Sequence, residues 1–194
     1  MKIVLSGGGT LGPVAPLLAI AVAYKKIHPT AEFIWVGTKT GPERELIGEY
    51  QIPFFVISSG KWRRYFSWQN IIDLFRLKIA FWQSIFLLRK EKPDLLISAG
   101  GFVSVPLHWT AWLFRIPTWV HQQDVHPGFA NRLMAWRATK VTVAVKESIK
   151  YFSQAEWIGN PVRDLSVVNY LDSKTRFNIP ANATTIFALG GGTG

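Results

Sequence analysis

The chain has 194 residues, of which 48% are hydrophobic, so it is large enough for one complete domain and part of another, and global disorder is excluded. It contains no cysteine, which excludes a disulfide framework and a thiolate metal site and is typical of a reducing compartment. The net charge of +10 indicates an anionic partner: a phosphate compound, a nucleic acid or a membrane surface.

The chain opens with a short apolar run, Ile3–Ser6, a glycine-rich turn, and an apolar helical stretch, Val14–Ile27. The turn, Gly7-Gly8-Gly9-Thr10-Leu11-Gly12, satisfies G-x-G-x-x-G, a pattern that lets backbone N–H groups approach a phosphate; a tight turn without a ligand is the alternative. The next strand ends at Thr38 without the acid that a dinucleotide ribose requires, so a phosphate or sugar diphosphate is favoured. The glycines and Pro13 argue against a signal peptide, and no apolar run reaches the ~18 residues of a membrane-spanning helix.

Strand and helix patterns then alternate along the chain, which predicts an α/β fold with a Rossmann-like, doubly wound parallel sheet. The expected strands are short, continuous apolar runs, as is typical of strands buried on both faces. They lie at 3–6, 33–36, 54–57, 95–98, 118–121, 141–145 and 156–158, and the expected helices at 14–27, 43–50, 69–90, 105–114, 130–138 and 146–152. Ligands of such folds bind beyond the carboxyl ends of the strands.

The segment over residues 61–90 mixes aromatic residues with seven Lys or Arg and one Asp. Aromatic rings and cations together favour contact with an anionic membrane, although stacking on single-stranded nucleic acid or a buried helix with a solvated basic end gives the same composition. The residues predicted to contact the membrane are Trp62, Arg63, Arg64, Trp68 and Phe75.

Three more polar or glycine-rich loops follow predicted strands. Ser98–Phe102 is a second glycine loop, and two such loops at one sheet edge favour a diphosphate ligand over glycines kept only for packing. His121–Gly128 holds two imidazoles and a carboxylate, which indicates a reactive site, although a structural histidine or a turn-capping Asp124 is the alternative. Gly159–Arg163 offers a guanidinium fork to a sugar or phosphate, or is a plain exposed turn.

The end of the chain repeats the pattern of its beginning, an apolar strand followed by glycines. Residues 164–184 are polar and suit a connection between domains, and 185–189 predict a strand that leads into glycines at 190–194. We therefore expect one domain over 1–163, with 164–194 forming a connection and the first strand and glycine loop of a second domain.

These motifs together resemble the MurG-type glycosyltransferases of glycosyltransferase family 28, over the whole chain. The resemblance is carried by Gly8-Gly9-Thr10-x-Gly12, Gly100-Gly101-Phe102-Val103-Ser104-x-Pro106, His121-x-Gln123, Pro127-Gly128-x-Ala130-Asn131-Arg132 and Gly159-Asn160-Pro161-Val162-Arg163. It implies the N-terminal half of a GT-B fold and an inverting enzyme of peptidoglycan synthesis that needs no metal or cofactor.

The reaction implied is transfer of N-acetylglucosamine from UDP-N-acetylglucosamine to an undecaprenyl-diphospho-muramoyl-pentapeptide, at the cytoplasmic face of the cell membrane. The enzyme would be peripheral to that membrane, and this chain alone is expected to be inactive because the donor half is missing. A non-catalytic membrane subunit that presents a lipid-linked sugar to a separate glycosyltransferase is the alternative, and a nucleic-acid-binding protein, indicated by charge alone, is a third.

The resemblance also implies residue roles. The acceptor diphosphate would lie on Gly8, Gly9, Gly100 and Gly101, and the donor on Thr10, Leu11, Gly12, Asp124, Arg163 and Gly192. The sequence departs from the family where a histidine of the first loop is replaced by Pro13, and where the family's His-Glu-Gln-Asn becomes His121-Gln122-Gln123-Asp124. Asp124 is therefore the expected general base, with His126 in reserve; the alternative is that Asp124 only hydrogen-bonds the donor sugar.

Overall fold

The computed structural model describes residues 1–58, 68–163, 169–186 and 188, and it describes no side chains at 68–74, 170 and 171. The chain forms two compact units, Met1–Val162 and Arg163–Gly194, which are treated separately below.

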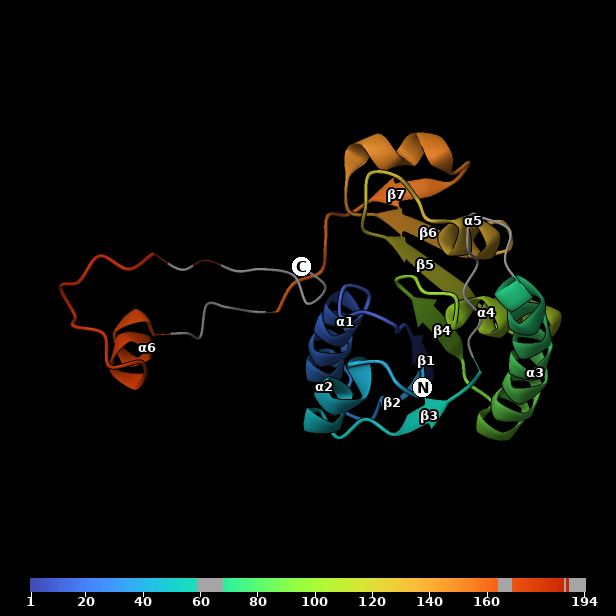
Figure 1. Cartoon of the computed structure of the whole chain (residues 1–194), viewed down its shortest axis with the longest axis horizontal. Helices are drawn as coiled ribbons and strands as arrows, with labels where there is room; N and C mark the ends of the chain where they lie inside the picture. Colours follow the sequence, from blue (N-terminus) through green and yellow to red (C-terminus); the bar gives the residue numbers. More distant parts are fainter. Residues whose placement is uncertain (59–67, 164–168, 187, 189–194) are drawn as a thin grey trace. The chain divides into compact units, whose positions relative to one another are not determined.

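The first unit is built on a parallel sheet of seven strands (Figure 1). The strands are β1 (Lys2–Ser6), β2 (Glu32–Gly37), β3 (Phe54–Val56), β4 (Leu95–Ser98), β5 (Thr118–Gln122), β6 (Lys140–Val143) and β7 (Ala155–Trp157). Their order in the sheet is β3-β2-β1-β4-β5-β6-β7, and every neighbouring pair is parallel. The predicted α/β fold with a doubly wound parallel sheet is confirmed, and each expected strand of this unit is present within one or two residues of its predicted ends.

The helices of this unit are also where the sequence predicts them. They are α1 (Val14–Ile27), α2 (Glu43–Glu49), α3 (Trp68–Glu91), α4 (Ser104–Leu113) and α5 (Phe129–Ala135). The stretch after β6 is a 3₁₀ helix, η1 (Lys146–Tyr151), instead of the expected helix over 146–152. A 3₁₀ turn is common in such short connectors.

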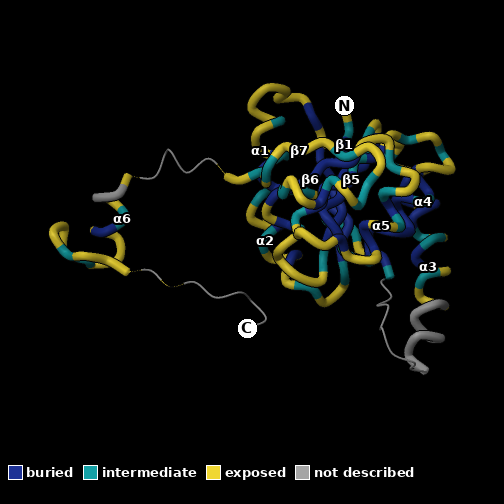
Figure 2. The backbone as a smooth tube through the Cα atoms, turned by 90° about the horizontal axis from the view of Figure 1, so that it is seen from above, coloured by how far each residue is buried: buried dark blue, intermediate teal, exposed yellow. Residues whose placement is uncertain are grey.

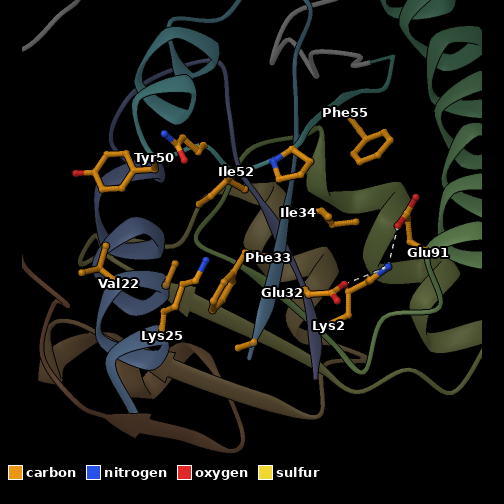
Figure 3. Close-up of a pocket in the computed structure, with 14 residues that line it drawn as sticks. Lys2, Val22, Lys25, Glu32, Phe33, Ile34, Tyr50, Ile52, Phe55 and Glu91 are labelled. Atoms are coloured by element: carbon orange, nitrogen blue, oxygen red, sulfur yellow. Dashed lines mark hydrogen bonds and ion pairs between the residues drawn. The ribbon is translucent and has the colours of Figure 1, made fainter. Parts of the chain in front are cut away.

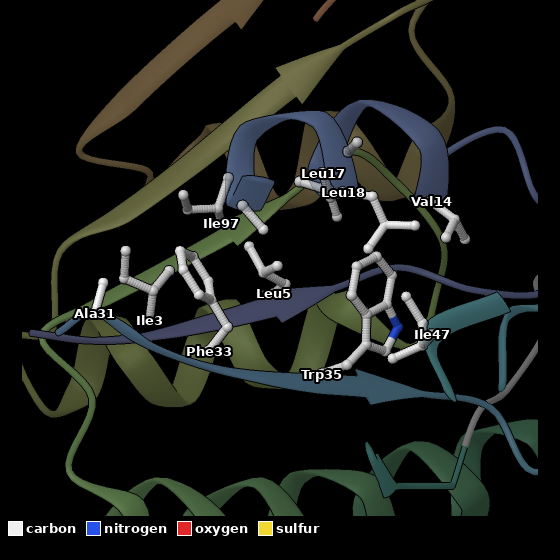
Figure 4. Close-up of a cluster of buried hydrophobic side chains, with 12 residues drawn as sticks. Ile3, Leu5, Val14, Leu17, Leu18, Ala31, Phe33, Trp35, Ile47 and Ile97 are labelled. Carbon is white, nitrogen blue, oxygen red and sulfur yellow. The ribbon is translucent and has the colours of Figure 1, made fainter. Parts of the chain in front are cut away.

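Helices cover both faces of the sheet, and the buried backbone lies at its centre (Figure 2). On one face, α1 and α2 pack on β1 and β2, with Leu17 and Ile47 against Leu5 and the fully buried Trp35 (Figure 4). On the other face, α3 and α4 pack on the same strands, and α5 packs on β5. A strand buried on both faces must be apolar throughout, which explains the continuous apolar runs in the sequence.

The second unit contains a helix, α6 (Tyr170–Arg176), within the stretch expected to be a connection. The Lys174 ammonium donates to the carbonyls of Ala181 at 2.8 Å and Ala183 at 2.6 Å, so the chain after α6 folds back on the helix. Of the strand expected over 185–189, the described residues Thr185, Ile186 and Ala188 are not in a strand. A parallel strand exists only through its ladder partners, so the start of a second domain stays a prediction here.

Candidate functional site

The two glycine loops of the first unit begin side by side. β1 and β4 are neighbours, with Ser6 paired to Ser98, and the strand order reverses between them. The first loop (residues 7–12) and the second loop (99–103) therefore leave the carboxyl edge of the sheet at its topological switch point, where open α/β sheets bind ligands.

The first loop is anchored to the core of the sheet. The Gly7 N–H donates to the Val36 carbonyl at 3.4 Å, and the indole N–H of the buried Trp35 donates to the Gly7 carbonyl at 3.1 Å. Gly9 then turns the chain with a φ of +86°, a conformation that favours glycine. The loop ends at Leu11, whose carbonyl accepts the Val14 N–H at 3.0 Å as α1 begins.

The second loop lies against the first. Gly100 and Gly101 have φ values of +126° and +93°, and a Cβ on Gly101 would lie 3.0 Å from the carbonyl oxygen of Gly8. Below them, the hydroxyl of Ser104 is 2.9 Å from that of Ser6 and donates to the Gly100 carbonyl at 3.2 Å. Glycine is thus required by backbone conformation and close approach, and the four predicted acceptor-site glycines lie in two adjacent loops.

Glu43, at the start of α2, connects the first loop to the loop after β2, a role that the sequence analysis did not predict. Its carboxylate is fully buried. One oxygen accepts the Thr38 N–H at 2.8 Å and the Thr38 hydroxyl at 2.6 Å, and the other accepts the Gly9 N–H at 3.2 Å. Gly8 and Gly41 pack so closely on this carboxyl group that a Cβ on either would collide with it.

A pocket of about 970 Å³ opens between these loops and α3. Its walls come from both glycine loops, residues 38–42 after β2, residues 56–58 at the end of β3, and α3. The charged residues that line it are Lys39 and Arg76, and no carboxylate of the described residues does so. The pocket is therefore suited to an anion, as the sequence predicts for this edge.

His121, in the third predicted loop, is a structural residue. Its ring is buried, with Nδ1 2.9 Å from the Thr142 hydroxyl and Nε2 3.3 Å from the Asn160 side-chain oxygen. The Asn160 side-chain oxygen can only accept, so the proton of the neutral ring is on Nε2 and Nδ1 is an acceptor. The Thr142 hydroxyl, which also accepts the indole N–H of Trp119 at 2.7 Å, therefore donates to Nδ1. Burial lowers the pKa of His121, opposed by the hydrogen bond to Asn160, and the ring stays neutral.

The two predicted catalytic residues lie on the exposed part of the same loop. Asp124 is exposed, and its carbonyl accepts hydrogen bonds from Gln122 at 2.8 Å and Ser148 at 3.0 Å, which fix the backbone beneath the carboxylate. His126 is exposed as well, and its Nδ1 lies 2.8 Å from the Tyr151 hydroxyl. Both side chains are accessible to a substrate, and their roles stay predictions.

The predicted donor residues are divided between the two units. Thr10, Leu11 and Gly12 are exposed in the first loop, and Thr10 also lines the 970 Å³ pocket. Arg163 belongs to the second unit, and Gly192 lies outside the described residues.

The exposed face of α3 carries an apolar stripe. Phe75, Ile79, Trp82 and Phe86 follow the helical period and are 61%, 51%, 62% and 70% exposed. We call these four residues the α3 stripe. Of the predicted membrane contacts, Phe75 is in the stripe, the Trp68 side chain is not described, and Trp62, Arg63 and Arg64 lie outside the described residues.

An apolar groove of about 390 Å³ runs beside the α3 stripe. Its walls come from α3, α4 and α5: Leu77, Lys78, Phe81, Trp82, Val105, Pro106, Trp109 and Leu133. At its edge, the guanidinium of Arg137 lies 4.6 Å from the ring centre of Trp112 and 4.2 Å from that of Trp136. Exposed apolar side chains bordered by cations mark interaction surfaces, in particular with lipid.

Another pocket, of about 490 Å³, lies at the amino ends of the strands, opposite to the edge from which the glycine loops leave the sheet (Figure 3). There the ammonium of Lys2 lies 3.1 Å from Glu91 and 3.6 Å from Glu32. This pocket is formed around the amino ends of β1 and β2, away from the glycine loops.

In the described part of the chain, no helix is long and apolar enough to cross a membrane, and no three His, Asp or Glu side chains gather as metal ligands.

Comparison with known proteins gives a family match over most of the chain. Residues 3–143 match the glycosyltransferase family 28 N-terminal domain. A Clostridium kluyveri protein named UDP-N-acetylglucosamine–N-acetylmuramyl-(pentapeptide) pyrophosphoryl-undecaprenol N-acetylglucosamine transferase is 44% identical over 84% of this chain and 46% of its own length. A Geobacillus kaustophilus protein of the same name is 36% identical over 100% of this chain and 55% of its own length. The chain thus spans about half the length of the curated relatives it matches.

Solved structures show the same fold. MurG of Acinetobacter baumannii superposes with a TM-score of 0.69 at 24% identity, over 85% of this chain and 46% of that one. UDP-GlcNAc 2-epimerase of Methanocaldococcus jannaschii superposes with a TM-score of 0.61 at 13% identity, over 82% of this chain and 46% of the epimerase.

Proposed function

The chain belongs to glycosyltransferase family 28, whose N-terminal domain it carries, and from this membership we propose that it is the acceptor-binding part of an N-acetylglucosaminyltransferase. The donor is UDP-N-acetylglucosamine, and the acceptor is the undecaprenyl-diphospho-muramoyl-pentapeptide that becomes lipid II. The relatives at 36–44% identity bear the name of this activity. The observation that carries the proposal is the contact of the two glycine loops beside a cation-lined pocket at the switch point.

In the proposed reaction, the 4-hydroxyl of the muramoyl sugar attacks C1 of N-acetylglucosamine. The new C–O bond forms as the bond from C1 to the UDP oxygen breaks, with inversion at C1, and UDP leaves with that electron pair. A base takes the hydroxyl proton; this base is Asp124, which is exposed on the loop after β5, and His126 is the reserve. His121 is not a candidate, because its side chain is buried and both of its ring nitrogens are already hydrogen-bonded, to Thr142 and to Asn160.

The protein is proposed to act at the cytoplasmic face of the membrane, as a peripheral protein bound to anionic lipid. The α3 stripe supplies apolar side chains for the lipid interface, and Lys78 and Arg89 lie on the same helix. Each cation near an anionic surface contributes about 1 kcal/mol of binding free energy, which salt screens. The lipid-linked acceptor would thus be bound by a protein that is already at the membrane.

The proposed activity is tested by measuring lipid II formation from donor and lipid-linked acceptor. One sample is the chain alone, and the other is the chain fused at Gly194 to the remaining C-terminal part of the Geobacillus kaustophilus relative, which serves in full length as the positive control. We expect turnover by the fusion and none by the chain alone, because a GT-B site needs both domains. A folded fusion without turnover contradicts the activity, and turnover by the chain alone at the rate of the control contradicts its role as the acceptor part only.

A further inference from the structure

The buried carboxylate of Glu43 changes how the first loop can bind an anion. Glycine loops bind phosphates through free backbone N–H groups. Here the Gly9 N–H already donates to Glu43 at 3.2 Å, so it is not available to a ligand. An anion in this pocket therefore needs positive side chains.

Lys39 is one of the two cations that line the pocket among the described residues, and it can supply that charge. It is exposed, it lines the 970 Å³ pocket together with Gly8, Gly9 and Gly101, and it follows directly on Thr38. Glu43 accepts hydrogen bonds from both the N–H and the hydroxyl of Thr38. One buried carboxylate thus fixes the backbone next to Lys39 and the first glycine loop at the same time.

Resting on the proposed function, we propose that Lys39 binds the diphosphate of the lipid-linked acceptor, and that Glu43 is the positioning residue that holds the Lys39 loop against the first glycine loop. Arg76, on α3, is the other cation that lines this pocket in the described part of the chain. The lysine ammonium is a compact point charge on a flexible stem, so it can follow a phosphate group that is itself anchored through a membrane-bound lipid.

The test is calorimetric binding of geranyl diphosphate, a short soluble prenyl diphosphate, to the chain as it is. A hydrogen bond between charged groups contributes about 1.5–3 kcal/mol, so Lys39→Gln should raise the Kd by about 10-fold or more. Lys39→Arg should restore most of the affinity, since it keeps the charge. The matched control is Lys25→Gln, which removes the same charge from an exposed position on α1 at the opposite edge of the sheet and should leave the Kd within about twofold.

Two further readouts separate binding from fold maintenance. The slope of log Kd against log salt should decrease for Lys39→Gln, because one ionic contact is lost, and it should not change for Lys25→Gln. Glu43→Gln should also raise the Kd for geranyl diphosphate. This increase should be much smaller in the Lys39→Gln background, because a positioning residue acts through its partner. Equal effects of Glu43→Gln in both backgrounds would overturn its positioning role.

A diphosphate is present in the acceptor and in the nucleotide sugar, so UDP-N-acetylglucosamine forms a second arm of the test. In the fused protein, which has both domains, Lys39→Gln is expected to leave the binding of UDP-N-acetylglucosamine unchanged; an effect confined to UDP-N-acetylglucosamine would overturn the assignment to the acceptor. Absence of geranyl diphosphate binding to the wild type, or unchanged binding by a folded Lys39→Gln protein, would overturn the proposal. These results are distinct from failure of the transfer assay, because geranyl diphosphate binding requires neither a donor nor a second domain.

Discussion

Glu43→Gln is the substitution that tests how the candidate site is held together. The side chain keeps its size, and its remaining oxygen can still accept both Thr38 hydrogen bonds. Its NH₂ group then faces the Gly9 N–H, where the carboxylate oxygen accepted a hydrogen bond at 3.2 Å. Two hydrogen-bond donors then face each other beside a side chain that is itself fully buried, and no hydrogen-bond acceptor is gained.

The expected cost follows from this geometry. A hydrogen bond to a charged group contributes about 1.5–3 kcal/mol, and a buried donor without a partner costs about 1–3 kcal/mol. These two effects overlap, so we expect the free energy of unfolding to fall by about 3 kcal/mol. For a domain of this size, each kcal/mol lowers Tm by about 2–4 °C, which gives a decrease of about 6–12 °C.

Urea and thermal unfolding followed by circular dichroism measure both quantities. Glu45→Gln is the control, because Glu45 is an exposed acid in the same first turn of α2, and its loss should cost less than about 1 kcal/mol. The reasoning is refuted if Glu43→Gln is no more destabilising than Glu45→Gln, since the hydrogen bonds of the buried carboxylate would then not hold the loops.

Three further outcomes are expected. His108 is buried in α4 with no hydrogen-bond partner for either ring nitrogen among the described residues, and burial lowers its pKa to about 3. The unfolded state takes up a proton on His108 near pH 6.5 and the folded state does not, so the free energy of unfolding should fall by about 3 kcal/mol between pH 7 and pH 4. Urea titrations should show that His108→Leu removes this loss. If the wild type and His108→Leu lose stability in parallel as the pH falls, the prediction is contradicted. The double variant Trp82→Ser, Phe86→Ser should bind anionic vesicles at least about tenfold more weakly in co-sedimentation, whereas Ile27→Ser, an exposed apolar control on α1, should bind like the wild type. Equal binding by the wild type and both variants would contradict a role of the α3 stripe in membrane binding. In the fused enzyme, Asp124→Asn should lower kcat by about 10²–10⁴-fold if Asp124 is the base, and an unchanged kcat with an altered donor KM would make it a binding residue.

The sheet and its helices were predictable because each strand carries its own signal. A parallel strand covered on both faces is an uninterrupted apolar run, so β1 and β4 could be recognised without their neighbours. The loops that follow them could then be assigned to one edge by topology alone. The contact between Gly8 and Gly101 follows from that placement, which is why two separate glycine motifs predicted one site.

Glu43 could not be predicted in the same way. Its sequence context, directly after Pro42, is that of an ordinary acid at the start of a helix, which is expected to be exposed. Its burial arises from Gly9, 34 positions away in the chain, and from the small residues that surround the carboxyl group. For His121 the sequence left two interpretations open, a reactive or a structural histidine. Its partner Asn160 lies 39 positions away, so the local sequence could not decide between them.

The position of β1 in the middle of the sheet has a consequence for how the protein folds during synthesis. β1 pairs with β2 on one side, but its other partner is β4, and the backbone N–H of Lys2 bonds to the Asp94 side chain across 92 positions of sequence. Closing a loop of that length costs on the order of 4 kcal/mol of chain entropy. At about 5–20 residues per second, the ribosome needs about 5–20 s to reach the second glycine loop after the first has emerged. Through that interval the first strand has one open edge, and the two glycine loops can meet only when β4 docks. Mutations that slow this docking should therefore lower the yield of folded protein in cells more than they lower its equilibrium stability.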